Sequence, residues 1–346
     1  MAPLLKVDDL HVSFATDDGL VRAVDGMTLS LEPGEIVAVV GESGSGKSVT
    51  ALTVMGLTRG PNVSFGGSIE YKDEDLLNAP DERLRRVRGA EIAMIFQDPM
   101  TSLNPVMRVG DQIAEQILAH EDVPKDEATE RAVQMLDRVG IPRARDRASN
   151  YPHEFSGGMR QRVMIAMALS CDPSILIADE PSTALDVTIQ AQILERLREL
   201  RHTANAGIIL VTHDLGVVAD IADRVLVMYA GRIVEQGTLD EVFYNPQHPY
   251  TWGLLGSITR LDIPPPPRLP SISGAPPSLA ARPEGCHFRP RCPHEFDKCT
   301  EDPPLEPRAG DSRTHCDRCW LSPEDKQARR YVSEDQIGLE AKGAIA

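Results

Sequence analysis

The chain has 346 residues, of which 41% are hydrophobic, and a formal net charge of -16 at neutral pH. This acidic surplus repels phosphate backbones and excludes nucleic acid as the main partner. No apolar run reaches the roughly 18 residues of a membrane span, and no secretory signal is evident at the N-terminus. We therefore expect a cytoplasmic protein that meets a membrane only through a partner, with enough residues for more than one structural unit.

The first strands in chain order differ in their patterns. Residues 4–14, 23–31 and 67–71 read as short strands separated by turns, which predicts an antiparallel layer. Residues 36–40 are apolar throughout, as in a strand buried on both faces. Similar runs follow at three positions, with helical patterns between several of them, and together they predict a parallel α/β sheet; they are residues 92–96, 175–178 and 208–212.

A glycine-rich turn follows the strand at 36–40. It reads Gly41-Glu-Ser-Gly-Ser-Gly-Lys47-Ser48 and leads into a helical pattern, which is the context of a phosphate-binding loop. Glycines let backbone N–H groups converge on a triphosphate, and the helix N-terminus adds its positive dipole end. Lys47 is expected to reach the β- and γ-phosphates, and Ser48 to ligate Mg²⁺. The expected nucleotide contacts of the loop are Gly41, Ser43, Gly44, Ser45, Gly46, Lys47, Ser48 and Val49.

Residues 105–170 carry three helical patterns and predict a mostly helical insertion. The last of these helices begins after the turn Phe155-Ser-Gly-Gly-Met159, which has two interpretations. Ser156 is a good helix cap, and this alone accounts for the residue. Alternatively, the helix N-terminus is a second anion site, which is most useful if it faces the nucleotide of a second subunit.

The strand at 175–178 ends in two adjacent acids, Asp179 and Glu180. On its own, this pattern describes a strand that ends in solvated carboxylates. With the phosphate loop present, Asp179 is expected to hold Mg²⁺, directly or through water, and Glu180 to polarise the water that attacks the γ-phosphate. A hairpin is predicted at residues 224–235, where apolar runs flank an Ala-Gly turn.

These motifs together resemble the ATP-binding cassette (ABC) ATPases over residues 4 to about 240, including Ser182-Thr-Ala-Leu-Asp186. The resemblance implies a P-loop fold and further roles. Gln97 contacts Mg²⁺ or the attacking water, His213 hydrogen-bonds the γ-phosphate, and Asp186 couples two sites across a dimer. Phe14 stacks on adenine. The γ-phosphate of the opposite subunit is then held by Ser156, Gly157 and Gly158, and the catalytic set is Lys47, Gln97, Glu180 and His213.

Three segments narrow the resemblance to the oligopeptide/dipeptide importer ATPases: residues 97–105, residues 245–251 and a cysteine-rich tail. It implies ATP hydrolysis that powers peptide import, at the cytoplasmic face of the cell membrane. The implied partners are a second identical or homologous ATPase, two permease subunits and an extracytoplasmic peptide-binding protein. Nickel or oligosaccharide import remains an alternative, because substrate contacts lie in other subunits. A soluble ABC ATPase without a transport role is the alternative from another class.

The composition changes near residue 250. We predict a nucleotide-binding domain over 1–250, a proline-rich connector over 251–283, a small cysteine-rich module over 284–322 and a charged tail over 323–346. Five of the six cysteines fall after the connector; they are Cys286, Cys292, Cys299, Cys316 and Cys319.

These cysteines suggest a metal or cluster site. A reducing cytosol disfavours disulfides, and structural zinc usually has closer ligand spacings, which only the pair Cys316 and Cys319 shows. Iron-sulfur clusters take four thiolates. The family resemblance implies a four-iron four-sulfur cluster with zinc as the alternative, and a structural role suits so small a module. The favoured ligands are Cys286, Cys292, Cys299 and Cys319, with Cys316 as the alternative fourth ligand.

Overall fold

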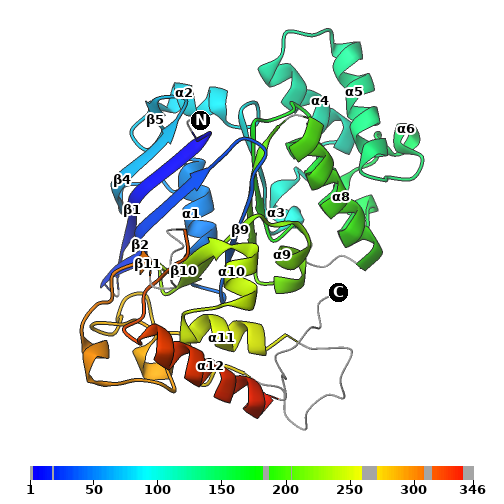
Figure 1. Cartoon of the computed structure of the whole chain (residues 1–346). Helices are drawn as coiled ribbons and strands as arrows, with labels where there is room; N and C mark the ends of the chain where they lie inside the picture. Colours follow the sequence, from blue (N-terminus) through cyan, green and yellow to red (C-terminus); the bar gives the residue numbers. More distant parts are fainter. Residues whose placement is uncertain are drawn as a thin grey trace.

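The computed structural model describes residues 3–17, 19–181, 187–203, 205–258, 271–307 and 314–337. In these residues the strands form two sheets (Figure 1): a four-stranded one in the order β2-β1-β4-β5 and an eight-stranded one in the order β11-β12-β10-β9-β3-β8-β7-β6. The strands are β1 (Leu5–Thr16), β2 (Gly19–Leu31), β3 (Ile36–Val40), β4 (Val63–Tyr71), β5 (Glu74–Asp75), β6 (Ile92–Ile95), β7 (Ile175–Asp179), β8 (Gly207–Thr212), β9 (Arg224–Tyr229), β10 (Arg232–Thr238), β11 (Glu306–Pro307) and β12 (Cys316–Asp317).

Most helices lie around the large sheet, and several of them group together at one end of the molecule (Figure 1). The α-helices are α1 (Lys47–Val54), α2 (Asp81–Val87), α3 (Pro99–Ser102), α4 (Val109–His120), α5 (Lys125–Arg138), α6 (Ala144–Arg147), α7 (Gly157–Ala168), α8 (Val187–Thr203), α9 (Leu215–Ile221), α10 (Leu239–Tyr244), α11 (Pro249–Gly256) and α12 (Pro323–Ile337). Short 3₁₀ helices are η1 (Pro152–Glu154), η2 (Arg289–Arg291) and η3 (Asp297–Thr300).

The middle of the large sheet is parallel, as predicted. Strand β3 pairs in parallel with β8 and β9, and β7 pairs in parallel with β8 and β6. Every residue of β3, β7 and β8 is buried. The apolar runs are therefore explained by cover on both faces of the sheet, and successive side chains of β3 enter different cores.

The two largest cores flank this parallel sheet. One lies between the sheet and the helices α4, α5, α7, α8 and α9. The other lies between the sheet, helix α1 and the antiparallel strands β1, β2 and β4. The predicted antiparallel layer and helical insertion are thus both present, and the insertion projects at one end of the molecule (Figure 1). Because β3, β7 and β8 are parallel, the loops that follow them lie together at the carboxyl edge of the sheet.

The cysteine-rich segment is not supported as a separate module. Strand β12 pairs with β10, and β11 pairs with β12, so the segment adds two strands to the large sheet. Phe288 of the segment is buried in a core shared with Val40 and Tyr250. A segment with so few apolar residues is stable here because it shares the core of the main unit.

Two predicted boundaries also differ from the structure. Helix α11 occupies the start of the predicted connector, and helix α12 covers residues 323–337 of the predicted tail. The two helices lie side by side (Figure 1). A buried ion pair fixes α12, since Lys326 Nζ lies 2.7 Å from both carboxylate oxygens of Asp317 in β12. The prolines at 264–267 lie outside the described residues.

Candidate active site

The predicted phosphate loop spans the gap between the end of β3 and the start of α1. Gly41 has φ 152° and Gly46 has φ 106°, conformations that residues with a side chain rarely adopt. A Cβ atom on Gly41 would lie 2.1 Å from the Met228 carbonyl oxygen, and one on Gly46 would lie 2.5 Å from that of Ala23. The loop is thus pressed against neighbouring backbone, and only glycine fits at these two positions.

Lys47 closes over the inner side of this loop. Its ammonium donates to the carbonyl oxygens of Gly41, at 2.7 Å, and Glu42, at 3.0 Å. Burial lowers the pKa of Lys47, and the carboxylates of Glu180, Asp179 and Glu42 oppose that shift. The side chain is therefore a buried cation with acids around it.

Ser48 and Asp179 meet beside the loop. The Ser48 hydroxyl donates to Asp179 Oδ1 over 3.1 Å, although the residues are 131 positions apart in the chain. Burial raises the pKa of Asp179, and nearby Glu180 adds to the shift, whereas Ser48 and Lys47 oppose it. A hydroxyl and a carboxylate offer the oxygen ligands that Mg²⁺ prefers.

Glu180 and His213 form a second contact. His213 Nδ1 lies 2.9 Å from Glu180 Oε1; the Glu180 side chain is 14% exposed and that of His213 64% exposed. Glu180 has φ 50°, a strained value for a residue with a side chain, and its N–H donates to the Val211 carbonyl oxygen. Glu180 follows the last residue of β7, and its carboxylate contacts His213, which follows β8.

The other predicted residues are more widely distributed. Gln97 is exposed just after β6, on the strand edge next to β7. Phe14 lies in β1, paired in register with Val21 and Val63, and is only partly buried. Asp186, with the rest of the segment 182–186, lies outside the described residues.

Ser156 is the N-cap of α7. Its hydroxyl accepts a hydrogen bond from the Met159 N–H over 3.4 Å, so the capping interpretation holds. Ser156 and Gly157 are nevertheless exposed, and Gly158 is half-buried. The helix N-terminus is therefore free on this chain to meet another molecule.

Four of the five C-terminal cysteines line one small cavity of about 10 Å³: Cys286, Cys292, Cys299 and Cys319. Cys316 instead lies in β12, opposite Gln236. Burial raises the pKa of Cys286 to about 11 and those of Cys292 and Cys319 to about 12. In the part of the chain that the structure describes, no three His, Cys, Asp or Glu side chains are placed to hold a metal ion.

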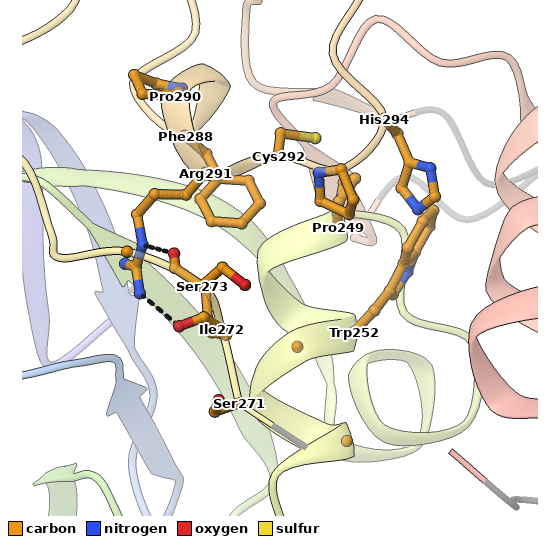
Figure 2. A pocket seen from close by; sticks show the side chains of 14 residues that line it. Pro249, Trp252, Ser271, Ile272, Ser273, Phe288, Pro290, Arg291, Cys292 and His294 are labelled. Carbon is orange, nitrogen blue, oxygen red and sulfur yellow. Dashed lines mark hydrogen bonds between the residues drawn. The ribbon is translucent and has the colours of Figure 1, made fainter. Parts of the chain in front are cut away.

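The sequence did not predict an ion pair that joins the phosphate loop to the C-terminal segment. Glu42 of the loop forms a bidentate ion pair with Arg291, which also donates to the carbonyl oxygens of Ile272 and Ser273 (Figure 2). One indication was available, because an acid next to bound phosphate is favoured in its charged form by a nearby cation. Nothing in the sequence identified which cation.

Comparison with known families agrees with this architecture. The family model described as ABC transporter matches residues 24–183. A second model, described as oligopeptide/dipeptide transporter, C-terminal region, matches residues 234–299.

Two relatives are similar over most of their length. The oligopeptide transport ATP-binding protein OppD of Salmonella typhimurium is 56% identical over 303 residues, which cover 88% of this chain and 90% of the relative. The dipeptide transport ATP-binding protein DppD of Bacillus subtilis is 51% identical over 333 residues, which cover 96% of this chain and 98% of the relative.

Solved structures share the fold. The dimeric post-hydrolysis state of the ATP-binding cassette MJ0796, bound to ADP and phosphate, superposes with a TM-score of 0.63 at 24% identity. The superposition covers 68% of this chain and 98% of the MJ0796 chain. The structure of cbiO1 from Clostridium perfringens superposes with a TM-score of 0.58 at 29% identity. The superposition covers 71% of this chain and 92% of cbiO1.

Proposed function

Because this chain belongs to the ABC transporter family, in its oligopeptide and dipeptide branch, we propose that it is the ATPase subunit that powers peptide import. The reaction is hydrolysis of ATP to ADP and phosphate. The observation that carries the proposal is the meeting of the phosphate loop with Asp179, and of Glu180 with His213, at one edge of the sheet. A P-loop, an acid pair and a histidine are the parts that such a reaction needs.

Each residue of the site has a proposed role. Lys47 leaves its two carbonyl partners and binds the β- and γ-phosphates, while Ser48 and Asp179 hold Mg²⁺, which offsets phosphate charge. Glu180 accepts a proton from the attacking water, and His213 contacts the γ-phosphate and holds the Glu180 carboxylate in place. Gln97 contacts the metal or the attacking water, Phe14 stacks on adenine, and Asp186 couples the two sites.

The proposed working state is a dimer of ATPases. The exposed N-terminus of α7, with Ser156, Gly157 and Gly158, binds the γ-phosphate held by the second subunit, which is an identical or homologous chain. ATP then closes the dimer and hydrolysis reopens it.

The proposed location is the cytoplasmic face of the cell membrane. None of the helices among the described residues combines the length and apolar character that crossing a bilayer requires. The proposed attachment is to two permease subunits, which receive peptide from an extracytoplasmic binding protein.

For the cysteines, we propose a four-iron four-sulfur cluster bound by Cys286, Cys292, Cys299 and Cys319. The support is that these four thiols line the same cavity, whereas Cys316 lies in β12. In the described residues the thiols are not placed to hold a metal ion, so a cluster would have to draw them together. A cluster would lower the raised pKa values of the thiols by binding their deprotonated forms, and would cross-link the loops that carry them. Zinc is the alternative occupant.

Anaerobic purification followed by iron, sulfide and zinc analysis tests this assignment. We expect about four iron atoms per chain, from the cluster type. C319S should lose the iron, whereas C316S should keep it. Zinc without sulfide, or iron loss in C316S alone, would contradict the proposed cluster or its fourth ligand.

The function is tested by affinity purification of the chain from its native membranes. We expect two multi-span permeases and a peptide-binding protein to come with it, and we expect peptide to stimulate ATP hydrolysis by the complex. Stimulation by nickel or an oligosaccharide instead would reassign the substrate. Recovery from the soluble fraction without membrane partners would favour a non-transport ATPase.

A further inference from the structure

The phosphate loop carries an acid, Glu42, next to the position proposed for a triphosphate. Arg291 neutralises it: Nη1 lies 2.6 Å from Glu42 Oε2, and Nη2 lies 3.0 Å from Glu42 Oε1. The Arg291 side chain is 5% exposed and that of Glu42 29% exposed. A bidentate, mostly buried pair of this kind fixes both position and orientation.

Arg291 is itself held from three directions. Nε donates to the Ser273 carbonyl oxygen at 2.9 Å, and Nη2 lies 3.4 Å from that of Ile272 (Figure 2). The guanidinium also lies over the ring of Tyr229, 5.7 Å from its centroid. The arginine therefore connects β9, the backbone at residues 272–273 and the phosphate loop.

A second contact, a backbone hydrogen bond, also holds Glu42. The Glu42 N–H donates to the Tyr250 hydroxyl over 2.9 Å, and Tyr250 is fully buried. Its ring packs on Phe288, with the centroids 5.4 Å apart. Both the backbone and the side chain of Glu42 are thus anchored to the C-terminal part of the chain, 208 and 249 positions away.

From these contacts we infer that Arg291 is a positioning residue for the phosphate loop, and that it couples the ATP site to the C-terminal segment that carries the cysteines. Arg291 directly precedes Cys292, which lines the cysteine cavity, so the residue that holds the loop is bonded to a residue of that cavity. The inference rests on the proposed function, since it takes the loop to be the ATP site. Thermodynamic coupling is reciprocal: a segment that orders the loop for ATP is itself ordered by ATP.

The physical basis is preorganisation. A loop that is already held in its binding conformation loses less conformational entropy when it binds a ligand. The hydrogen bonds between Glu42 and Arg291 do not involve Glu180, so their loss should weaken nucleotide binding and raise KM more than it lowers kcat.

A set of three variants of the full chain tests the positioning role, with a fluorescent ATP analogue as the probe. R291Q and E42Q should each raise its Kd about ten-fold, which corresponds to about 1.4 kcal/mol of binding free energy. The double variant should bind no more weakly than either single one. K298Q is the matched control, because Lys298 lies over the Trp320 ring in the same segment. It should bind as the wild type does.

The competing explanation is charge alone. If Arg291 only screens the Glu42 carboxylate from phosphate, E42Q should bind ATP at least as tightly as the wild type, and it should rescue R291Q. Either result would overturn the positioning role. R291K adds a further check: the charge stays but the bidentate contact is lost, so the Kd should still rise.

Coupling itself is measured by hydrogen exchange in residues 271–299, with and without a non-hydrolysable ATP analogue at saturation. We expect the nucleotide to slow exchange there in the wild type and K298Q but not in R291Q or E42Q. Unchanged exchange in a wild-type chain that binds the analogue would refute the coupling and leave the proposed function standing. Failure of the wild type to bind any nucleotide would instead refute the proposed function.

Discussion

Glu180, the proposed catalytic base, has three notable properties. It is mostly buried, it contacts His213, and its backbone adopts a conformation that is strained for a residue with a side chain. Residues in such conformations persist only where the surrounding structure enforces them, and they are common at functional sites. Lys47 lies close enough to Glu180 for the acid to raise the pKa of the lysine, against the larger effect of burial. The acid therefore lies within electrostatic reach of the lysine of the phosphate loop.

We predict that Glu180→Gln keeps ATP binding but lowers kcat by a factor of about 100 or more, because the amide cannot accept the proton of the attacking water. Single-turnover hydrolysis and equilibrium binding of labelled ATP measure the two quantities. His213→Gln should lower kcat to a smaller extent. Wild-type turnover in the Glu180→Gln variant would remove Glu180 from the role of base.

At the start of helix α7, Ser156 has a capping role and a proposed binding role. Ser156 caps the helix through its hydroxyl, and the same hydroxyl is exposed at the helix N-terminus. Capping residues typically contribute about 1 kcal/mol to stability. Stability and the proposed contact with a second subunit can therefore be separated only by a substitution that keeps the cap.

Ser156→Asp is that substitution. Aspartate caps helices as well as serine does, but its charge would repel the γ-phosphate of the opposite subunit. We predict wild-type thermal stability for Ser156→Asp, little change in the affinity of the monomer for ATP, and loss of ATP-dependent dimerisation in sedimentation experiments. Ser156→Ala should lose about 1 kcal/mol of stability and weaken dimerisation less severely. Normal dimerisation of Ser156→Asp would limit Ser156 to its capping role.

On the scale of the whole molecule, one carboxylate joins three parts of the fold. Asp25 of β2 lies 2.8 Å from guanidinium nitrogens of both Arg232, in β10, and Arg282, in the C-terminal segment. Burial raises the pKa of Asp25, but Arg232, Arg282 and His11 together outweigh burial, so its pKa is lowered. The antiparallel sheet, the large sheet and the C-terminal segment thus share a mostly buried ionic cluster.

We predict that Asp25→Asn lowers the free energy of unfolding by about 3 kcal/mol at pH 7, because it leaves two mostly buried arginines without their shared partner. Urea denaturation measures this. Since the folded pKa is lowered, the contribution is complete above the ordinary aspartate value of 3.8 and disappears as the pH falls through the lower folded value. The difference between wild type and variant should therefore shrink below pH 4.

The matched control is Asp302→Asn, which removes the other partner of Arg232. The Asp302 side chain is 52% exposed, so solvent screens the pair and the expected loss is below about 1 kcal/mol. Equal losses in the two variants would contradict the central role of Asp25.

Much of this protein followed from local sequence patterns. Continuous apolar runs predicted the buried parallel strands, and the spacing of glycines between Val40 and Lys47 predicted the loop that binds phosphate. Ser48 and Asp179 were each predicted to hold Mg²⁺, and the fold brings them into contact, because β3 and β7 run parallel in one sheet and end at the same edge, with β8 between them. These features depend on residue type and short-range periodicity, which a single sequence displays directly.

Other features were decided only by the tertiary structure. The strands β11 and β12 have two residues each, too few to display an alternating pattern, so the cysteine-rich segment read as a separate module. The partner of Glu42 lies 249 positions away in the chain. Pairs so distant are selected by the folded backbone, which places one guanidinium within reach of one carboxylate. The sequence by itself therefore determined the family and the nucleotide loop, whereas the connection between that loop and the cysteine cavity required the assembled fold.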